Sequence, residues 1–237
     1  ISAASVVQLC LASGVRPASL ELLEMRVMPM MAALSGIDPV DRAALLISCD
    51  GASEAAVDDD IDLVTELVLE AGGTIEPTTR DSFDAIMSAR KKLGPEVARR
   101  SGMRTLKLVD IAVPLSAFAD AVELAYRILD AASLEGFVFG HAGDGNLHVL
   151  IASDSRDDEL WARSSKAADD IVLGAIALEG TITGEHGIGA AKRHLLRAEH
   201  GDAVDVMGLI KSALDPRGIL NPGTILPDDA WTREGAS

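Results

Sequence analysis

The sequence predicts an α+β fold, in which an antiparallel sheet carries helices packed on one face. Segments with strand and helix periodicity alternate, so strand-helix-strand units recur along the chain. A turn signal at residues 140–148 joins two strands directly, and such a hairpin makes an antiparallel pair. The composition is rich in alanine and only 3% aromatic, which favours helices over a β-sandwich.

In the first half of the chain, a helix is expected at 6–12 and is followed by a segment at 20–28 that reads as either a strand or a short helix. A continuous apolar run predicts a strand at 43–49. Ser53 is a candidate N-cap for an amphipathic helix that ends at Gly72. The remaining expected elements are a strand at 74–78 and a helix, capped by Asp81, that reaches residue 92.

The second half opens with a strand at 106–113 and a long helix at 117–132, with Ser116 as its candidate cap. After the hairpin we expect a helix at 157–178, a short strand at 180–183 and a helix that begins near Gly189. A last helix is expected at 204–214, and the polar residues after Pro227 are expected to fray.

Charge, hydropathy and cysteine content narrow the classes of partner and the cellular compartment that we expect. The net charge is −16, which opposes nucleic acid and anionic membranes as partners. No apolar run approaches the ~20 residues of a membrane span. Cys10 and Cys49 are isolated and predict buried thiols in a reducing compartment, hence a cytoplasmic protein. Because the sequence opens at Ile1 as if inside an element, we expect it to be part of a longer polypeptide.

Two glycine-rich segments carry the candidate site. A hairpin over 140–148 would bring the rings of His141 and His148 close enough to share an ion, and Glu185 in the second segment offers a third ligand. The same histidines could instead be hydrogen-bonded residues of a tight turn. His186 could act as a base, or could pack against backbone. The glycines at 140–145 and 184–189 fit neither the dinucleotide fingerprint nor the Walker loop.

Three motifs, G-H-A-G-D-G-N-L-H at 140–148, G-E-H-G-I-G at 184–189 and D-P-R-G-I-L-N-P-G at 215–223, stand in a distinctive order and spacing. Together they resemble the C-terminal portion of the FAD-linked oxidases of the vanillyl-alcohol oxidase superfamily. Similar members are D-lactate dehydrogenases, the glycolate oxidase flavin subunit and D-2-hydroxyglutarate dehydrogenases. The resemblance implies a ferredoxin-like substrate (cap) domain over residues 1–227 and a polar tail at 228–237. The N-terminal FAD-binding domain would be absent from this chain, which should be inactive alone.

The resemblance also implies a role for each matching residue. His141, His148 and Glu185 would be ligands of a divalent metal, most often zinc. His186 would remove the proton of the substrate hydroxyl, and Arg90 would bind the substrate carboxylate. Asn221 would lie near the flavin ring of FAD.

Two positions depart from the family pattern. Some relatives have a lysine two places before the D-x-x-x-P segment, here Asp110 to Pro114, but this chain has Leu108 there and Lys107 one place off. The hydroxyglutarate enzymes have an asparagine where this chain has Leu150. A second carboxylate on the substrate would therefore be bound less securely.

The function expected is oxidation of a 2-hydroxy acid to the 2-oxo acid, with hydride transfer to FAD. The partners expected are a small 2-hydroxy acid, an electron-acceptor protein or quinone, and a second copy of the chain in a homodimer. Two alternatives stay open: a metal-dependent hydrolase or non-haem iron oxygenase with the same two-His one-Glu site, and a non-catalytic ligand-sensing module.

Overall fold

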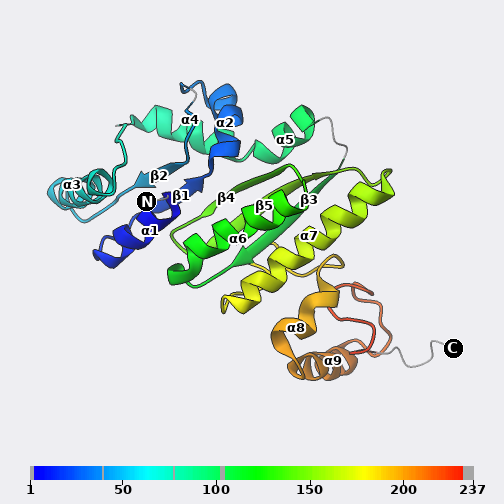
Figure 1. The fold of residues 1–237 in the computed structure, drawn as a ribbon. Helices are drawn as coiled ribbons and strands as arrows, with labels where there is room; N and C mark the ends of the chain where they lie inside the picture. Colours follow the sequence, from blue (N-terminus) through cyan, green and yellow to red (C-terminus); the bar gives the residue numbers. More distant parts are fainter. Residues whose placement is uncertain (1–2, 39, 77, 102–104, 232–237) are drawn as a thin grey trace.

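A five-stranded antiparallel sheet forms the centre of the molecule (Figure 1). The structure is a computed structural model that describes residues 3–38, 40–76, 78–101 and 105–231. The strand order is β2-β1-β4-β5-β3, and every neighbouring pair is antiparallel. The strands are β1 (Ser19–Leu23), β2 (Ala44–Ser48), β3 (Thr105–Ala112), β4 (Gly136–His141) and β5 (Asn146–Ser153).

The predicted hairpin joins β4 to β5 at the middle of the sheet. Its turn requires glycine at position 145, where φ is +80° and where a Cβ atom would collide with the carbonyl oxygen of Val113. The register sets His148 opposite Phe139 of β4 and opposite Asp110 of β3. The hairpin prediction is confirmed, and the turn fixes which strand positions face the site.

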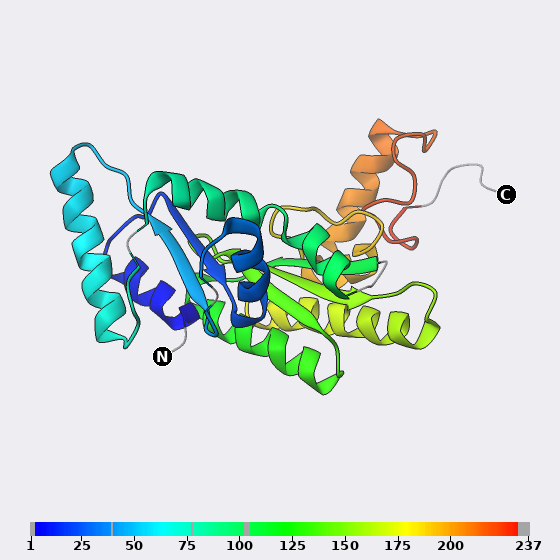
Figure 2. The ribbon, with the colours of Figure 1, turned by 90° about the horizontal axis from the view of Figure 1, so that it is seen from above.

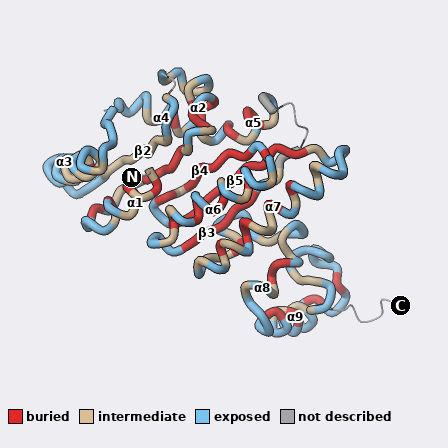
Figure 3. Tube along the Cα trace, viewed as in Figure 1, coloured by how far each residue is buried: buried red, intermediate tan, exposed pale blue. Residues whose placement is uncertain are grey.

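One face of the sheet is covered by two long helices, α6 (Phe118–Ala131) and α7 (Asp158–Ala177). Helix α1 (Ala3–Ala12) packs beside α6, and α3 (Glu54–Glu70) packs against α1. Small and branched residues fill this core, including Leu22 of β1 and Ile151 of β5, which are fully buried. Figure 3 shows the strands at the centre as the most continuously buried part of the chain.

The other face carries a second, smaller layer of helices, so the α+β class is confirmed with helices on both sides of the sheet (Figure 2). This layer contains α2 (Met28–Ser35), α4 (Arg80–Arg90) and α5 (Leu93–Ser101). Leu23 and Leu150 belong to its core, whereas Leu22 and Ile151 belong to the first, because successive strand residues face opposite sides.

Several expected boundaries differ in the structure. Of the predicted strand at 74–78, the described residues are not in a strand, and residue 77 lies outside them. Helix α4 is capped by Thr79 rather than Asp81, because the Thr79 hydroxyl accepts the Ser82 N–H. Ser53 caps α3 as predicted. A 3₁₀ turn at Leu115–Ala117 leads into α6 in place of the expected Ser116 cap.

The segment after α7 holds less regular structure than expected. Thr181 makes only an isolated bridge with Ala112, so no strand forms at 180–183. No helix begins near Gly189; a 3₁₀ turn at Arg193–Leu195 precedes α8 (Leu196–His200), and α9 (Ala203–Leu214) follows. This leaves residues 183–191 as a loop, and the loop carries Glu185 and His186 to the sheet.

The C-terminal segment packs back on the preceding helices. Asp228 pairs with Arg193, and Asp229 pairs with Arg197, each at 2.7 Å. The predicted frayed tail therefore begins with two anchored residues, and its residues 232–237 lie outside those described. Among the helices that the structure describes, we find none with both the length and the apolar character needed to cross a membrane.

Candidate metal and substrate site

Four polar side chains form a row across neighbouring strands of the sheet. They are Glu21 on β1, His141 on β4, His148 on β5 and Asp110 on β3, and register sets Glu21 opposite His141 and Asp110 opposite His148. The residues next to them along each strand point to the opposite face and lie in the first core. The row therefore faces the side of the sheet that carries α4 and α5. The sheet thus presents two imidazoles between two carboxylates.

The structure brings the three predicted metal ligands together. Glu185 Oε1 lies 3.2 Å from His148 Nε2 and 3.6 Å from His141 Nε2. The two imidazole rings are 5.5 Å apart, and one potential ligand atom from each of the three residues lies within 4.8 Å of the others. Two imidazole nitrogens and one carboxylate oxygen are donors suited to a divalent cation such as zinc.

Each histidine has a carboxylate on its other nitrogen. His141 Nδ1–H donates to Glu21 Oε1 at 2.7 Å, and this hydrogen bond is the main reason that the pKa of His141 is raised. His148 Nδ1 lies 3.4 Å from Asp110 Oδ1, a looser contact that is not a well-formed hydrogen bond. Carboxylates in these places favour the proton on Nδ1, which leaves a lone pair on each Nε2, the ring nitrogen that lies within 3.6 Å of Glu185 Oε1. This arrangement fits a metal better than it fits a simple turn.

Asp110 fixes the loop that brings Glu185. Its Oδ2 accepts the backbone N–H groups of Gly184, Glu185 and His186 at 2.9 to 3.0 Å, together with the Thr183 hydroxyl. Burial alone would raise the pKa of Asp110, but contacts with His148, these N–H groups and the Asn146 amide outweigh it, and the pKa is well below its usual range. Asp110 is therefore a buried anion that orders the loop.

His186 stands at the open side of the cluster. Its Nε2 lies 3.6 Å from Glu185 Oε1, and its ring is 5.4 Å from that of His148. Half of its side-chain surface is exposed, in contrast to 5% for His148. The predicted base can therefore meet a ligand that enters from solvent.

Arg90, the last residue of α4, reaches the same cluster from the second helical layer. Its Nη2 lies 3.3 and 3.4 Å from the two ring nitrogens of His141, and its guanidinium is 5.6 Å from the Phe139 ring. Arg90 Nε makes a close ion pair with Glu21 Oε2 at 2.7 Å, although the N–H is not aligned for a hydrogen bond. The predicted carboxylate-binding arginine thus stands beside the predicted metal ligands.

Asn221 lies apart from these groups in the exposed turn after α9. Its φ is +45°, and its carbonyl oxygen accepts hydrogen bonds from the amide and hydroxyl of Thr224. Its role next to the flavin stays a prediction.

The lysine position that departs from the family pattern is directed away from the site. Lys107 Nζ lies 3.3 Å from the centre of the Trp161 ring of α7, on the other side of the sheet. A different lysine, Lys192, approaches Asp110 to 3.8 Å and donates to the carbonyls of Asp110 and Ile182. Burial lowers the pKa of Lys192, and its contacts with Asp110 partly oppose that shift.

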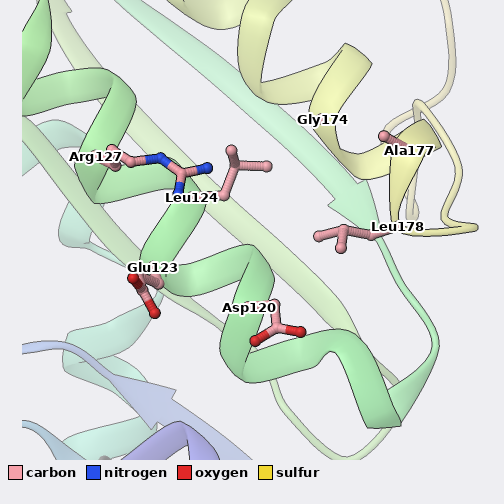
Figure 4. Close-up of a pocket in the computed structure, with 7 residues that line it drawn as sticks. All are labelled: Asp120, Glu123, Leu124, Arg127, Gly174, Ala177 and Leu178. Carbon is pink, nitrogen blue, oxygen red and sulfur yellow. The ribbon is translucent and has the colours of Figure 1, made fainter.

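A surface hollow of about 340 Å³ lies between α6 and α7 and shares no residue with the histidine cluster (Figure 4). It is lined by Asp120, Glu123, Leu124, Arg127, Gly174, Ala177 and Leu178. Its place on the first helical layer puts it across the sheet from the candidate site.

Sequence reasoning missed Glu21 and Asp110. Each is an acidic residue inside an otherwise apolar strand segment, with exposed fractions of 4% and 0%. A buried carboxylate in such a place requires a partner, so this pattern could have marked both as site residues.

Curated relatives match most of the chain. Glycolate oxidase subunit GlcD of Bacillus subtilis is 34% identical over 98% of the chain and 50% of the relative. The Escherichia coli subunit of the same name is 30% identical over 92% and 44%. D-lactate dehydrogenase [cytochrome] 1, mitochondrial, of Saccharomyces cerevisiae is 31% identical over 92% and 38%. The chain therefore spans half or less of the length of these relatives.

A solved structure supports the fold. The 4-ethylphenol oxidase of Gulosibacter chungangensis, in complex with isoeugenol, aligns with 96% of this chain and 53% of its own, with a TM-score of 0.62 at 15% identity. Residues 2–225 also match the family described as FAD linked oxidases, C-terminal domain. This chain belongs to that family.

Proposed function

We propose that this chain is the substrate- and metal-binding domain of a flavin-dependent dehydrogenase that oxidises a 2-hydroxy acid to the 2-oxo acid. The observation that carries the proposal is the convergence of His141, His148 and Glu185 beside His186 and Arg90. The names of the relatives, glycolate oxidase and D-lactate dehydrogenase, supply the substrate class.

His141, His148 and Glu185 would hold the divalent metal, with zinc favoured. Two imidazoles and one carboxylate leave coordination positions open, as catalytic zinc sites do. The carboxylates behind both histidines fit the usual surroundings of metal-bound imidazoles, in which the second ring nitrogen donates to a carboxylate.

Arg90 would bind the carboxylate of the substrate. A guanidinium can hold a carboxylate through two parallel hydrogen bonds, which fixes the orientation of the neighbouring carbon. The Arg90 guanidinium lies beside the cluster, with Nε paired with Glu21 and Nη2 3.3 Å from His141 Nε2.

His186 would accept the proton of the substrate hydroxyl at Nε2. Its exposed ring can reach the substrate, and the carboxylate of Glu185, 3.6 Å away, stabilises the imidazolium that forms. When bound, a divalent cation would supply positive charge beside the substrate hydroxyl, and FAD would accept the hydride.

The surroundings of the cluster favour a substrate with one carboxylate. Leu108 and Leu150 occupy the positions at which some relatives have polar groups, and Leu150 is buried in the second core. Lys192 is committed to two backbone carbonyls, and Lys107 contacts Trp161 on the other side of the sheet. Arg90 would therefore bind a single substrate carboxylate, such as that of lactate or glycolate.

The further expectations belong to the whole protein. An electron-acceptor protein or quinone would reoxidise the flavin, a homodimer is the assembly we expect, and the location we expect is the cytoplasm, although some relatives are named mitochondrial.

The test uses the full-length polypeptide that contains this chain, purified with its flavin. D-lactate, glycolate and D-2-hydroxyglutarate are each mixed anaerobically with the protein, and bleaching of the flavin absorbance is recorded with and without a chelator. We expect bleaching by D-lactate or glycolate, loss of rate after chelation, and recovery on adding Zn²⁺. Turnover in a preparation without flavin would instead indicate a metal-dependent hydrolase or oxygenase, and a lack of both metal and turnover would indicate a ligand-binding module.

A further inference from the structure

Glu21 is a buried carboxylate for which sequence and family resemblance give no role. It lies on β1 between Leu20 and Leu22, whose side chains pack in the first core, and its own side chain is only 5% exposed. Its position on the opposite face, directly across from His141, brings it to the candidate site.

Both oxygens of Glu21 are engaged by groups of the site. Oε1 accepts the Nδ1–H of His141 at 2.7 Å, and Oε2 pairs with Arg90 Nε at 2.7 Å. One carboxylate therefore contacts a predicted metal ligand and the predicted substrate-binding arginine, which come from β4 and α4. Of the two carboxylates behind the histidines, Glu21 makes the shorter contact, 2.7 Å compared with 3.4 Å for Asp110.

We propose that Glu21 is a positioning residue that couples metal binding to substrate binding. By accepting the proton on His141 Nδ1, it holds the tautomer whose Nε2 lone pair faces the cluster. By pairing with Arg90 Nε, it holds that guanidinium beside His141, with Nη2 3.3 Å from His141 Nε2. The inference rests on the function proposed above and adds a residue through which His141 and Arg90 act together.

The first test measures Co²⁺ binding to the 237-residue chain by its absorption spectrum and by competition with a chelator. Glu21→Gln keeps only one carbonyl oxygen for two donors, so we expect Co²⁺ affinity to fall about 10- to 100-fold, the usual effect of losing a group that orients a metal ligand. In the full-length flavoprotein we expect the same variant to raise KM for the hydroxy acid by a larger factor than it lowers kcat.

A double variant separates positioning from simple charge balance. Glu21→Met with Arg90→Met removes the buried ion pair as a unit and replaces it with apolar groups, which restores the balance of charge. If Glu21 only neutralised Arg90, this protein would bind Co²⁺ as tightly as the wild type. We expect binding to stay at least 10-fold weaker, because His141 still lacks its acceptor.

Glu24→Gln is the matched control, since it neutralises a partly buried carboxylate just beyond the same strand and away from the cluster. It should bind Co²⁺ like the wild type. Wild-type affinity in Glu21→Gln or in the double variant would overturn the inference, as would an equal loss in Glu24→Gln. Failure of the wild type itself to bind Co²⁺ would contradict the metal site of the proposed function, so the two failures are distinguishable.

Discussion

At the scale of single residues, buried carboxylates decide how the histidines of the site face one another. Asp110 holds the loop of Glu185 and His186 through four donors, and Glu21 holds His141. A buried anion is stable only where such donors surround it. The imidazoles therefore have a defined direction before any ligand arrives.

The residue with the clearest expected effect on the reaction is His186. His186→Asn removes the proton acceptor but leaves the backbone N–H that binds Asp110 in place. We expect kcat of the full-length protein to fall by about 10²- to 10⁴-fold, the range for loss of a general base. Zinc affinity should hardly change. Steady-state kinetics and zinc titration of the same preparation measure both effects.

His194→Asn provides the control for that substitution. His194 pairs with Asp169 on an exposed surface, away from the cluster, so its replacement should leave kcat at the wild-type value. An unchanged kcat in His186→Asn would remove this residue from the proposed proton transfer.

Sequence reasoning identified the histidines, Glu185 and Arg90 but not the carboxylates behind them. The histidines, Glu185 and Arg90 stand in sequence motifs that a local pattern or a family resemblance can identify. His141, which donates to Glu21, lies 120 positions away in the chain, and the loop groups that donate to Asp110 lie 73 to 76 positions away. Such contacts depend on the order of the strands in the sheet. The sequence pattern of a single strand does not reveal that order.

At the scale of elements, the turn of the β4–β5 hairpin requires a glycine at position 145. Gly145→Ala would hold alanine at φ +80° and press its Cβ against the Val113 carbonyl, so we expect a loss of about 1–3 kcal/mol of unfolding free energy. Gly94→Ala is the matched control. Gly94 lies in α5 with open space around a Cβ, and alanine there should be neutral or stabilising by up to about 1 kcal/mol. Urea denaturation compares the two, and equal effects would refute the role of the turn.

The turn after α9 depends on an ionised Asp215. The hydrogen bond from Lys211 is the main cause that lowers the pKa of Asp215 to about 2, aided by the N–H groups of Leu220 and Ile219. Because this folded pKa lies below the unfolded value near 4, the contribution to stability is complete above about pH 4 and is lost as the pH falls toward 2.

Asp215→Asn should therefore speed hydrogen exchange at the Ile219 and Leu220 amides at neutral pH, and the difference from the wild type should shrink between about pH 4 and pH 2. Asp205→Asn, at an exposed acid that pairs with Arg197, should leave these two amides unaffected. A difference that persists unchanged at pH 2 would contradict the ionised role of Asp215.

Elements with strong local signals were predicted well, and elements that depend on tertiary context were not. Ser53 caps its helix as expected, because its side-chain oxygen bonds within the same turn. The helix expected from residue 157 also forms, with Asp157 as its cap. The segment at 180–183 looked like a strand, but only Thr181 reaches the sheet. Thr183 turns instead toward Asp110, and the Ile182 N–H donates to Glu199, so the conformation comes from tertiary contacts and not from the local sequence.

At the scale of the whole molecule, the site joins parts of the chain that no single element could hold together. Strands β1, β3, β4 and β5, helix α4 and the loop at 183–191 each contribute at least one group. A bound metal would tie the hairpin to this loop and should stabilise the fold by about 3 kcal/mol at a free concentration 100 times its Kd. The α+β class could be predicted because alternating periodicities reveal it. The helix that became α4 was expected too, but its place in a second layer on the other face depends on tertiary contacts that the local sequence does not show.

The central claim is that His141, His148 and Glu185 hold one divalent cation. Zinc X-ray absorption spectroscopy of the purified chain, loaded with one equivalent of Zn²⁺, tests it most directly. We expect nitrogen and oxygen ligands near 2.0–2.1 Å from the metal, with scattering from two imidazoles. This signal should be unchanged in His194→Ala and lost in the double variant His141→Ala/His148→Ala. A two-imidazole signal that survives in that double variant would show that these histidines do not hold the metal.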